Sequence, residues 1–192
     1  PFRVLPGDDA SCLNLYQPSN PRILAPRDSF IAEGRFRFKG SLASTDAERD
    51  NPWLLLAREE PDGAVPVIAD ANSMTYVLHR ALGEDLEMSN GGETIRLRLV
   101  AALDDSIFQG EILMSQANFL KLFPDQAGSR FLLVDAPVDR LTAVSTAIEE
   151  ALADLGADAT PAADRLAEFH RVENTYLSTF QTLGGLGLML GT

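Results

Sequence analysis

The chain has 192 residues, a formal net charge of -12 at pH 7 and 23% charged residues, which is the composition of an ordinary soluble globular protein. Acidic residues outnumber Lys and Arg by 28 to 16, and this balance argues against general nucleic-acid binding, which depends on cations that neutralise phosphates. The single cysteine, Cys12, excludes an internal disulfide and a cysteine-rich zinc site, and we expect a buried, inert thiol there.

The first third of the chain is predicted to be largely irregular. Residues 16–28 contain three prolines, which break helices and remove ladder donors, so this stretch is interpreted as an extended loop. Residues 35–39, RFRFK, alternate cation and aromatic, which predicts a half-buried strand with its cations in water. Asn51 offers an N-cap and Pro52 a first helical position, so WLLL after them is predicted as a short buried helix.

The cations of this region form a basic island in an acidic chain. Two interpretations are open, a partner-binding patch or the solvated face of a strand. The members of the island are Arg22, Arg27, Arg35, Arg37 and Lys39.

From residue 65 the predicted elements are short and well punctuated. Residues 65–69 are predicted as a buried strand, followed by a helix from about Asn72 that Gly83 closes. The sequence SNGG at residues 89–92 predicts a tight hairpin turn, because Asn-Gly favours positive backbone angles, and residues 94–99 alternate as its half-buried second strand.

Two further strands are predicted, at residues 111–114 and 130–134. Between them Ser115 is expected to cap a helical turn that carries Phe119, Leu120 and Phe123.

Two helices are predicted after Pro137. The first places apolar residues three and four positions apart between Leu141 and Leu155 and ends at Gly156. The second begins at Thr160 and Pro161, a cap followed by proline, and aligns its apolar residues on one stripe. That stripe consists of Leu166, Phe169, Val172, Tyr176, Phe180 and Leu183.

The second helix carries no charge after Glu173. A membrane-spanning helix needs about 20 mainly apolar residues, and the run before Thr192 supplies roughly half of that number, so residues 177–192 are predicted as the start of a transmembrane helix that is cut short. Gly184, Gly187 and Gly191 fit the small-residue habit of such helices. The alternative is a glycine-rich tail that packs on its own domain.

No catalytic, cofactor-binding or metal site is predicted. His79 and His170 are far apart and belong to no ligand motif, and neither a G-x-S-x-G elbow nor a phosphate-binding G-x-x-x-x-G-K occurs. The pairs Asp8-Asp9 and Asp104-Asp105 could serve acid–base or metal chemistry, but loops tolerate such pairs freely as solvated residues.

The stretch ENTYLSTFQTLGGLG, residues 173–187, resembles the junction at which the extracytoplasmic domain of an FtsX-like, MacB-type ABC transporter permease runs into its next membrane helix. Residues 65–82, with ADAN at 69–72, and the opening DASCLNLY at 9–16 are similar to a bacterial branch of these permeases. The junction is the most specific part of the resemblance.

The resemblance implies an α+β fold with two lobes. Residues 1–64 and 137–176 would form a discontinuous, membrane-proximal α/β lobe, and residues 65–136 a smaller, β-rich lobe inserted between them. Breaks in the sequence pattern at about Gly63 and Pro137 agree with this layout.

The resemblance further implies a non-catalytic domain without cofactors, on the periplasmic side of a bacterial inner membrane. Its expected partners are a separate ABC ATPase subunit or domain, a second permease copy or homologue, and a periplasmic adaptor or outer-membrane protein. The helix that carries Leu166 to Leu183 would transmit ATP-driven motion of the membrane helices to the outer domain.

Two other functions are compatible with the residues, a soluble periplasmic binding or scaffold protein and a metal-dependent hydrolase that uses the aspartate pairs. The first predicts that a chain ended near Glu173 loses stability, because the apolar tail would be core. The second predicts thermal stabilisation by a metal ion.

Overall fold

The computed structural model describes residues 1–8 and 20–190, with the backbone alone for residues 172–174, 176–177 and 184–190. The predictions for Asp9 and Cys12, the opening segment of the resemblance and Gly191 lie outside the described residues. The chain divides into two compact units, Pro1–Leu133 and Val134–Thr192, and each is described by itself.

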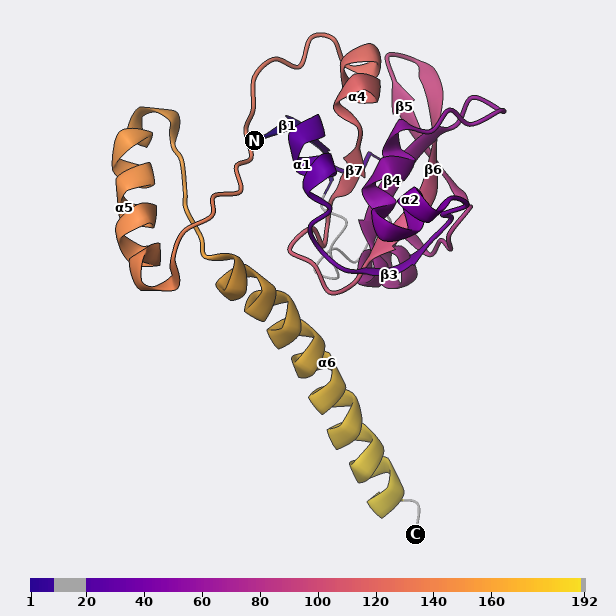
Figure 1. The fold of residues 1–192 in the computed structure, drawn as a ribbon. Helices are drawn as coiled ribbons and strands as arrows, with labels where there is room; N and C mark the ends of the chain where they lie inside the picture. The colour runs from indigo at the N-terminus through magenta and orange to yellow at the C-terminus, as the bar shows by residue number, and fades with distance from the viewer. Residues whose placement is uncertain (9–19, 191–192) are drawn as a thin grey trace. The chain divides into compact units, whose positions relative to one another are not determined.

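The strands of the first unit form one mixed, seven-stranded sheet (Figure 1). Their order is β1-β2-β7-β4-β6-β3, and β5 pairs with β6. The strands are β1 (Phe2–Leu5), β2 (Ile23–Pro26), β3 (Phe38–Ser41), β4 (Val65–Asp70), β5 (Asp85–Asn90), β6 (Glu93–Leu103) and β7 (Ile112–Met114).

Strand β6 organises this sheet because it is long enough to have three neighbours. It pairs in parallel with β4 along one edge, while β5 and β3 share its other edge, both antiparallel. The predicted hairpin is confirmed: Asn90 pairs with Glu93, and Gly91 and Gly92 between them have φ angles of 59° and 90°, which a tight primed turn requires.

Short helices connect the strands. They are α1 (Asp28–Glu33), α2 (Asp46–Asp50), the 3-10 helix η1 (Pro52–Ala57), α3 (Ala71–Ser73), the π-helical turn η2 (Met74–Leu78) and α4 (Gln116–Leu122). Two predicted caps are confirmed, since the Asn51 side chain accepts from the Trp53 N–H and the Ser115 hydroxyl accepts from the Asn118 N–H.

The central strands β2, β7 and β4 and the second half of β6 are buried on both faces, as expected for strands covered on two sides. On one face α3, η2 and α4 supply residues such as Val77 and Phe119 to a core built on the strands. On the other face η1 contacts β4 and β6. Trp53 of η1 belongs to an aromatic cluster whose other members are Phe2, Phe30, Phe36, Phe38, Phe108 and Phe131.

The second unit is helical and contains η3 (Val138–Arg140), α5 (Leu141–Ala151), η4 (Ala153–Leu155) and α6 (Ala162–Leu190). The two predicted helices are thereby confirmed, and Gly156 takes the left-handed conformation expected at a helix end. The amphipathic stripe of α5 is half-buried, and no residue of this helix is fully buried.

Two predictions for the early part of the chain are wrong. Within the expected loop at residues 16–28, Ile23–Pro26 is the fully buried strand β2, because neighbouring strands satisfy its backbone despite the nearby prolines. The expected strand at residues 35–39 begins only at Phe38, because Phe36 has a φ of 73° that interrupts the extended backbone. The alternation of exposed cations and half-buried aromatics is nevertheless present.

Two later predictions also need correction. The helix expected to reach Gly83 ends at Leu78, because His79 adopts a left-handed conformation with a φ of 50°. The strand expected at residues 130–134 is reduced to an isolated bridge between Phe131 and Phe2.

The α+β class is confirmed by a mixed sheet accompanied by separate helices. The two-lobed division of the chain stays a prediction. In the first unit β1, β2 and β3 share one sheet with β4 to β7, so strands from before and after Gly63 are hydrogen-bonded to one another.

Candidate functional site

The predicted coupling stripe lies on α6, a continuous helix of 29 residues. Leu166 and Phe169 near its start are half-buried, whereas Phe180 and Leu183 are 69% and 60% exposed. Val172 and Tyr176 belong to the same helix, but their side chains lie outside the description. Large apolar side chains therefore remain in solvent on the uncharged half of α6.

The hydroxyl groups in this half of α6 donate to carbonyls of their own helix. The hydroxyls of Thr175, Thr179 and Thr182 each donate to the carbonyl four residues earlier at 2.8 Å. The Ser178 hydroxyl donates to the Thr175 carbonyl at 3.0 Å. These four side chains need no hydrogen-bond partner outside the helix, which suits a helix placed in an apolar environment.

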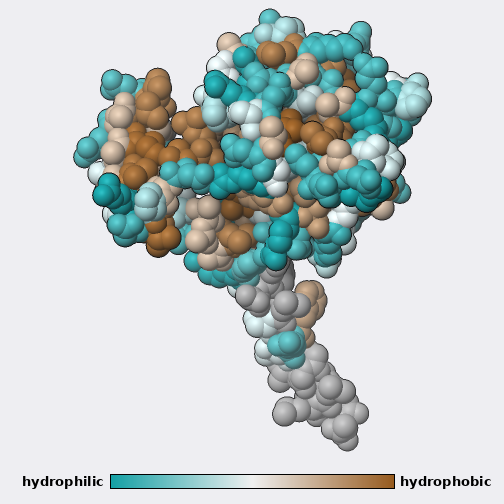
Figure 2. Space-filling model, in the orientation of Figure 1, coloured by the Kyte–Doolittle hydropathy of each residue, from teal (hydrophilic) through white to brown (hydrophobic). Residues whose placement is uncertain are grey.

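Apolar surface is also concentrated on the other helices of the second unit. Figure 2 shows apolar side chains gathered over α5. Val138 and Leu155, at the two ends of this helical segment, are 86% and 80% exposed. Among the residues that the structure describes, no helix combines the length and the apolarity needed to cross a bilayer.

The structure divides the predicted basic patch among three places, and two of these groups lie at different strands. Arg22 immediately precedes β2, and its guanidinium lies 3.4 Å from the buried Glu111 carboxylate. Arg37 and Lys39, which are exposed, lie before and within β3. Because β7, β4 and β6 separate β2 from β3, the two groups are roughly 19 Å apart by strand spacing.

The remaining members of the patch flank α1. Arg27 precedes this helix and is exposed, and Arg35, which follows it, lies 3.8 Å from Glu33. Partner binding by the patch therefore stays a prediction.

A buried carboxylate that sequence reasoning missed fixes the end of β4. Asp70 is fully buried, and its Oδ2 accepts from the Ser106 N–H at 2.7 Å and from the Ser106 hydroxyl at 2.8 Å. Its Oδ1 accepts from the Asn72 N–H at 2.9 Å, as an N-cap residue does. The carboxylate therefore ties the loop after β6 to the start of α3, and its burial suits a structural role.

Burial raises the pKa of Asp70 above its ordinary value of 3.8, although the hydrogen bonds from Ser106 oppose this effect. Between the ordinary pKa and the raised one, the folded chain holds more protons than the unfolded chain, so this group's contribution to the free energy of unfolding falls as pH rises. We therefore expect the stability advantage of the native chain over Asp70→Asn to shrink from about pH 4 upward and then level off.

Urea unfolding of both proteins at several pH values measures this advantage. Asp125→Asn, which removes an exposed carboxylate from another loop, is the control for the change in net charge. An advantage of the native chain that grows with pH would contradict the prediction, because it would mean that the fold favours the ionised carboxylate.

A second cluster that the sequence did not reveal joins the hairpin to the loop before β4. Arg98 of β6 contacts Asp85 at 2.8 Å, Asp62 at 2.7 Å and Glu60 at 3.1 Å. Arg96 contacts Asp62 at 2.9 Å and Asp85 at 3.2 Å. Hydrogen bonds from the two guanidinium groups hold the pKa of Asp62 well below its usual range.

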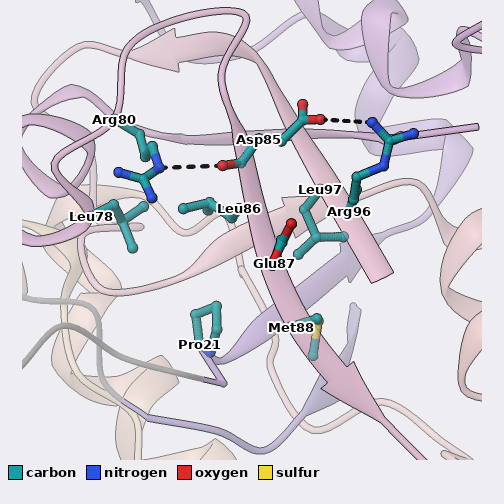
Figure 3. Close-up of a pocket in the computed structure, with 9 residues that line it drawn as sticks. All are labelled: Pro21, Leu78, Arg80, Asp85, Leu86, Glu87, Met88, Arg96 and Leu97. Carbon is teal, nitrogen blue, oxygen red and sulfur yellow. Dashed lines mark hydrogen bonds and ion pairs between the residues drawn. The ribbon is translucent and has the colours of Figure 1, made fainter. Parts of the chain in front are cut away.

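A cavity of about 600 Å³ lies against β5 (Figure 3). Its lining is partly apolar and partly charged. The lining residues are Pro21, Leu78, Arg80, Asp85, Leu86, Glu87, Met88, Arg96 and Leu97. Arg80 and Arg96 approach Asp85 from opposite sides. Arg80 donates to the backbone carbonyl of Asp85, and Arg96 donates to the Asp85 carboxylate. Among the described residues, this lining offers apolar side chains beside hydrogen-bonding and charged groups, which suits the binding of a ligand.

The two histidines of the chain belong to different units. His79 lies at the end of η2 and His170 lies on α6. Within residues 1–8 and 20–190, no group of three or more His, Cys, Asp or Glu side chains is arranged to hold a metal ion.

Comparison with known proteins finds a likeness among solved structures only. No protein-family model matches the chain, and no curated protein matches it. Among solved structures, the chain is similar to the periplasmic region of MacB from Actinobacillus actinomycetemcomitans, with a TM-score of 0.39 and 12% sequence identity over 83% of this chain and 67% of that one. A TM-score this low assigns neither a fold nor a function to the chain.

Proposed function

We propose that the chain is a non-catalytic extracytoplasmic domain of a bacterial ABC transporter permease, on the periplasmic side of the inner membrane. Residues 173–187 suggested this function by their resemblance to a membrane junction. The observation that carries it is the uncharged half of α6, where Phe180 and Leu183 are exposed while the nearby hydroxyl groups bond within the helix. Such a surface suits lipid better than water.

In this proposal α6 is the mechanical link between the membrane and the outer domain. A helix of 29 residues is about 44 Å long and transmits a displacement along its axis because its backbone hydrogen bonds are continuous. ATP would be hydrolysed by a separate subunit or domain, and the motion would reach the outer domain through Leu166 and Phe169, which are half-buried near the start of α6.

The proposed partners follow from this role. They are an ABC ATPase, a second permease copy or homologue, and an adaptor or outer-membrane protein in the periplasm. The exposed cations around β3, Arg37 and Lys39, offer a surface for an acidic partner.

Cysteine labelling of the full-length protein in cells tests the proposed position. We replace Cys12 with Ser and place single cysteines at Glu150, which is exposed on α5, or at Leu183 on α6. With the outer membrane permeabilised, an impermeant maleimide is expected to label Glu150→Cys at once. Leu183→Cys is expected to react only after detergent is added, because lipid shields the thiol.

Two outcomes would contradict the proposal, and they differ in meaning. Equal labelling of Leu183→Cys before and after detergent would place this part of α6 in water and favour a soluble binding or scaffold protein. Labelling of Glu150→Cys only in lysed cells would place the domain in the cytoplasm. Thr146→Cys, another exposed position of α5, is the control for the reactivity of that helix.

A further inference from the structure

Strand β5 is the longest strand of the sheet that is paired on one side only. Its six residues pair with β6 and with no other described strand. The edge strand β1 is shorter, and the backbone of Phe2 on its outer side bonds with Phe131 and Arg130. An edge strand with unused N–H and C=O groups is a template on which another strand can pair.

The register of the hairpin shows which backbone groups of β5 point outward. The pair Asn90–Glu93 flanks the two-residue turn and is hydrogen-bonded, and in antiparallel strands bonded and non-bonded pairs alternate. Asp85, Glu87 and Ser89 therefore direct their N–H and C=O groups away from β6.

Two observed hydrogen bonds confirm this alternation. The Leu99 N–H donates to the Glu84 carbonyl, as expected for a bonded pair. The Asp85 carbonyl accepts from Arg80 Nε at 3.3 Å, so it does point outward (Figure 3). The backbone groups of Glu87 and Ser89 have no hydrogen-bond partner on that side within the described part of the chain.

The surroundings of the edge define what fits there. Leu86 and Met88 face the core side of the strand, and the cavity beside them is lined further by Leu78. On the opposite side Asp85 is neutralised by Arg96 and Arg98, whereas Glu87 is exposed and makes no ion pair with a described residue. A strand added to this edge would meet an unpaired acid flanked by apolar side chains.

We propose that β5 is a docking edge for an extended segment of another protein, in which a basic residue lies opposite Glu87 and apolar residues flank it. The backbone of that segment would pair with Glu87 and Ser89, and its apolar side chains would enter the cavity beside Leu78. A second copy of β5 fits less well, because its outward-facing positions, Asp85, Glu87 and Ser89, include no cation that could lie opposite Glu87. The docking edge does not depend on the permease assignment.

Titration with the peptide Ac-TVKVTV-amide, followed by hydrogen exchange measured by NMR, tests the proposal. In the free protein the amides of Glu87 and Ser89 are expected to exchange fast, and those of Leu86 and Met88 slowly, because only the latter bond to β6. The peptide is expected to slow exchange at Glu87 and Ser89. The control peptide Ac-TVEVTV-amide is expected to bind about fivefold more weakly because its Glu lies opposite Glu87.

Two pairs of variants separate docking from other effects. Ser89→Pro removes an outward N–H that β6 does not use and should weaken peptide binding about tenfold, whereas Ser89→Ala keeps the N–H and should not. Glu87→Lys should weaken binding of the lysine peptide about fivefold, whereas Glu93→Lys makes the same charge change on β6 and should not. If Ser89→Pro fails to fold, the comparison of Glu87→Lys with Glu93→Lys still tests the proposal.

Three results would overturn the proposal. The first is no binding at millimolar peptide, and the second is slowed exchange at residues outside β5. The third is slow exchange at Glu87 and Ser89 without peptide that depends on protein concentration, which would show that a second copy occupies the edge.

Discussion

Trp53→Ala is expected to destabilise the first unit by about 3–5 kcal/mol, the cost of truncating a large aromatic side chain in a packed core. Trp53 is fully buried in η1, and its ring lies 5.1 and 5.5 Å from the rings of Phe30 and Phe38, edge to face. Its Nε1–H donates to the Arg35 carbonyl at 2.6 Å. The alanine variant would lose these contacts and leave the Arg35 carbonyl without its donor.

Urea or thermal unfolding of the purified chain measures this loss. Leu54→Ala is the matched control, because Leu54 lies next in the same helix but is 39% exposed, and we expect a change below about 1 kcal/mol. Trp53→Phe should fall between the two, since it retains an aromatic ring and loses the Nε1–H. A loss for Trp53→Ala no larger than that for Leu54→Ala would mean that the aromatic cluster does not hold η1 on the sheet.

Elements whose signals are local could be predicted from the sequence. The turn at Asn90-Gly91-Gly92 needs positive φ angles, and the cap at Asn51 needs a side-chain oxygen near the Trp53 N–H. Both features depend only on residues that are adjacent in the sequence. The helix α5 and the turn η4, which Gly156 closes, follow from the periodicity of their own apolar residues. These predictions are confirmed because distant residues do not decide them.

Elements that depend on distant pairing could not be predicted. Ile23–Pro26 has the proline content of a loop, and it becomes a strand only because β1 and β7 satisfy its backbone on both sides. Arg98 is hydrogen-bonded to Asp62, which lies 36 residues earlier in the sequence, and Asp70 is hydrogen-bonded to Ser106, which lies 36 residues later. A single sequence shows the charges and hydroxyls but not which of them meet.

The docking edge shows the same limit at the level of function. The alternation at residues 94–99 predicts the second strand of the hairpin. It does not predict that β5 is an edge strand, because this depends on where the other strands of the sheet pair. Only the full strand order shows that Glu87 and Ser89 present unused backbone groups. The sequence signal that remains is the run DLEMSN, whose acids lie on the side opposite Leu86 and Met88.

In the full-length protein, Leu183→Asp is expected to reduce the equilibrium constant for membrane insertion of α6 about a hundredfold, because an aspartate in the middle of a membrane helix costs about 2.5–3.5 kcal/mol. Leu155→Asp makes the same change at another exposed leucine of the second unit, and we expect no effect there. Carbonate extraction of membranes, followed by the labelling of Leu183→Cys described above, reports insertion. Leu183 and Leu155 are 60% and 80% exposed, so in water the two substitutions should be equally mild, and only a lipid environment around Leu183 makes them differ. Equal behaviour of the two variants would therefore remove the membrane from the proposed role of α6, while the docking edge on β5 would stand or fall by its own experiment.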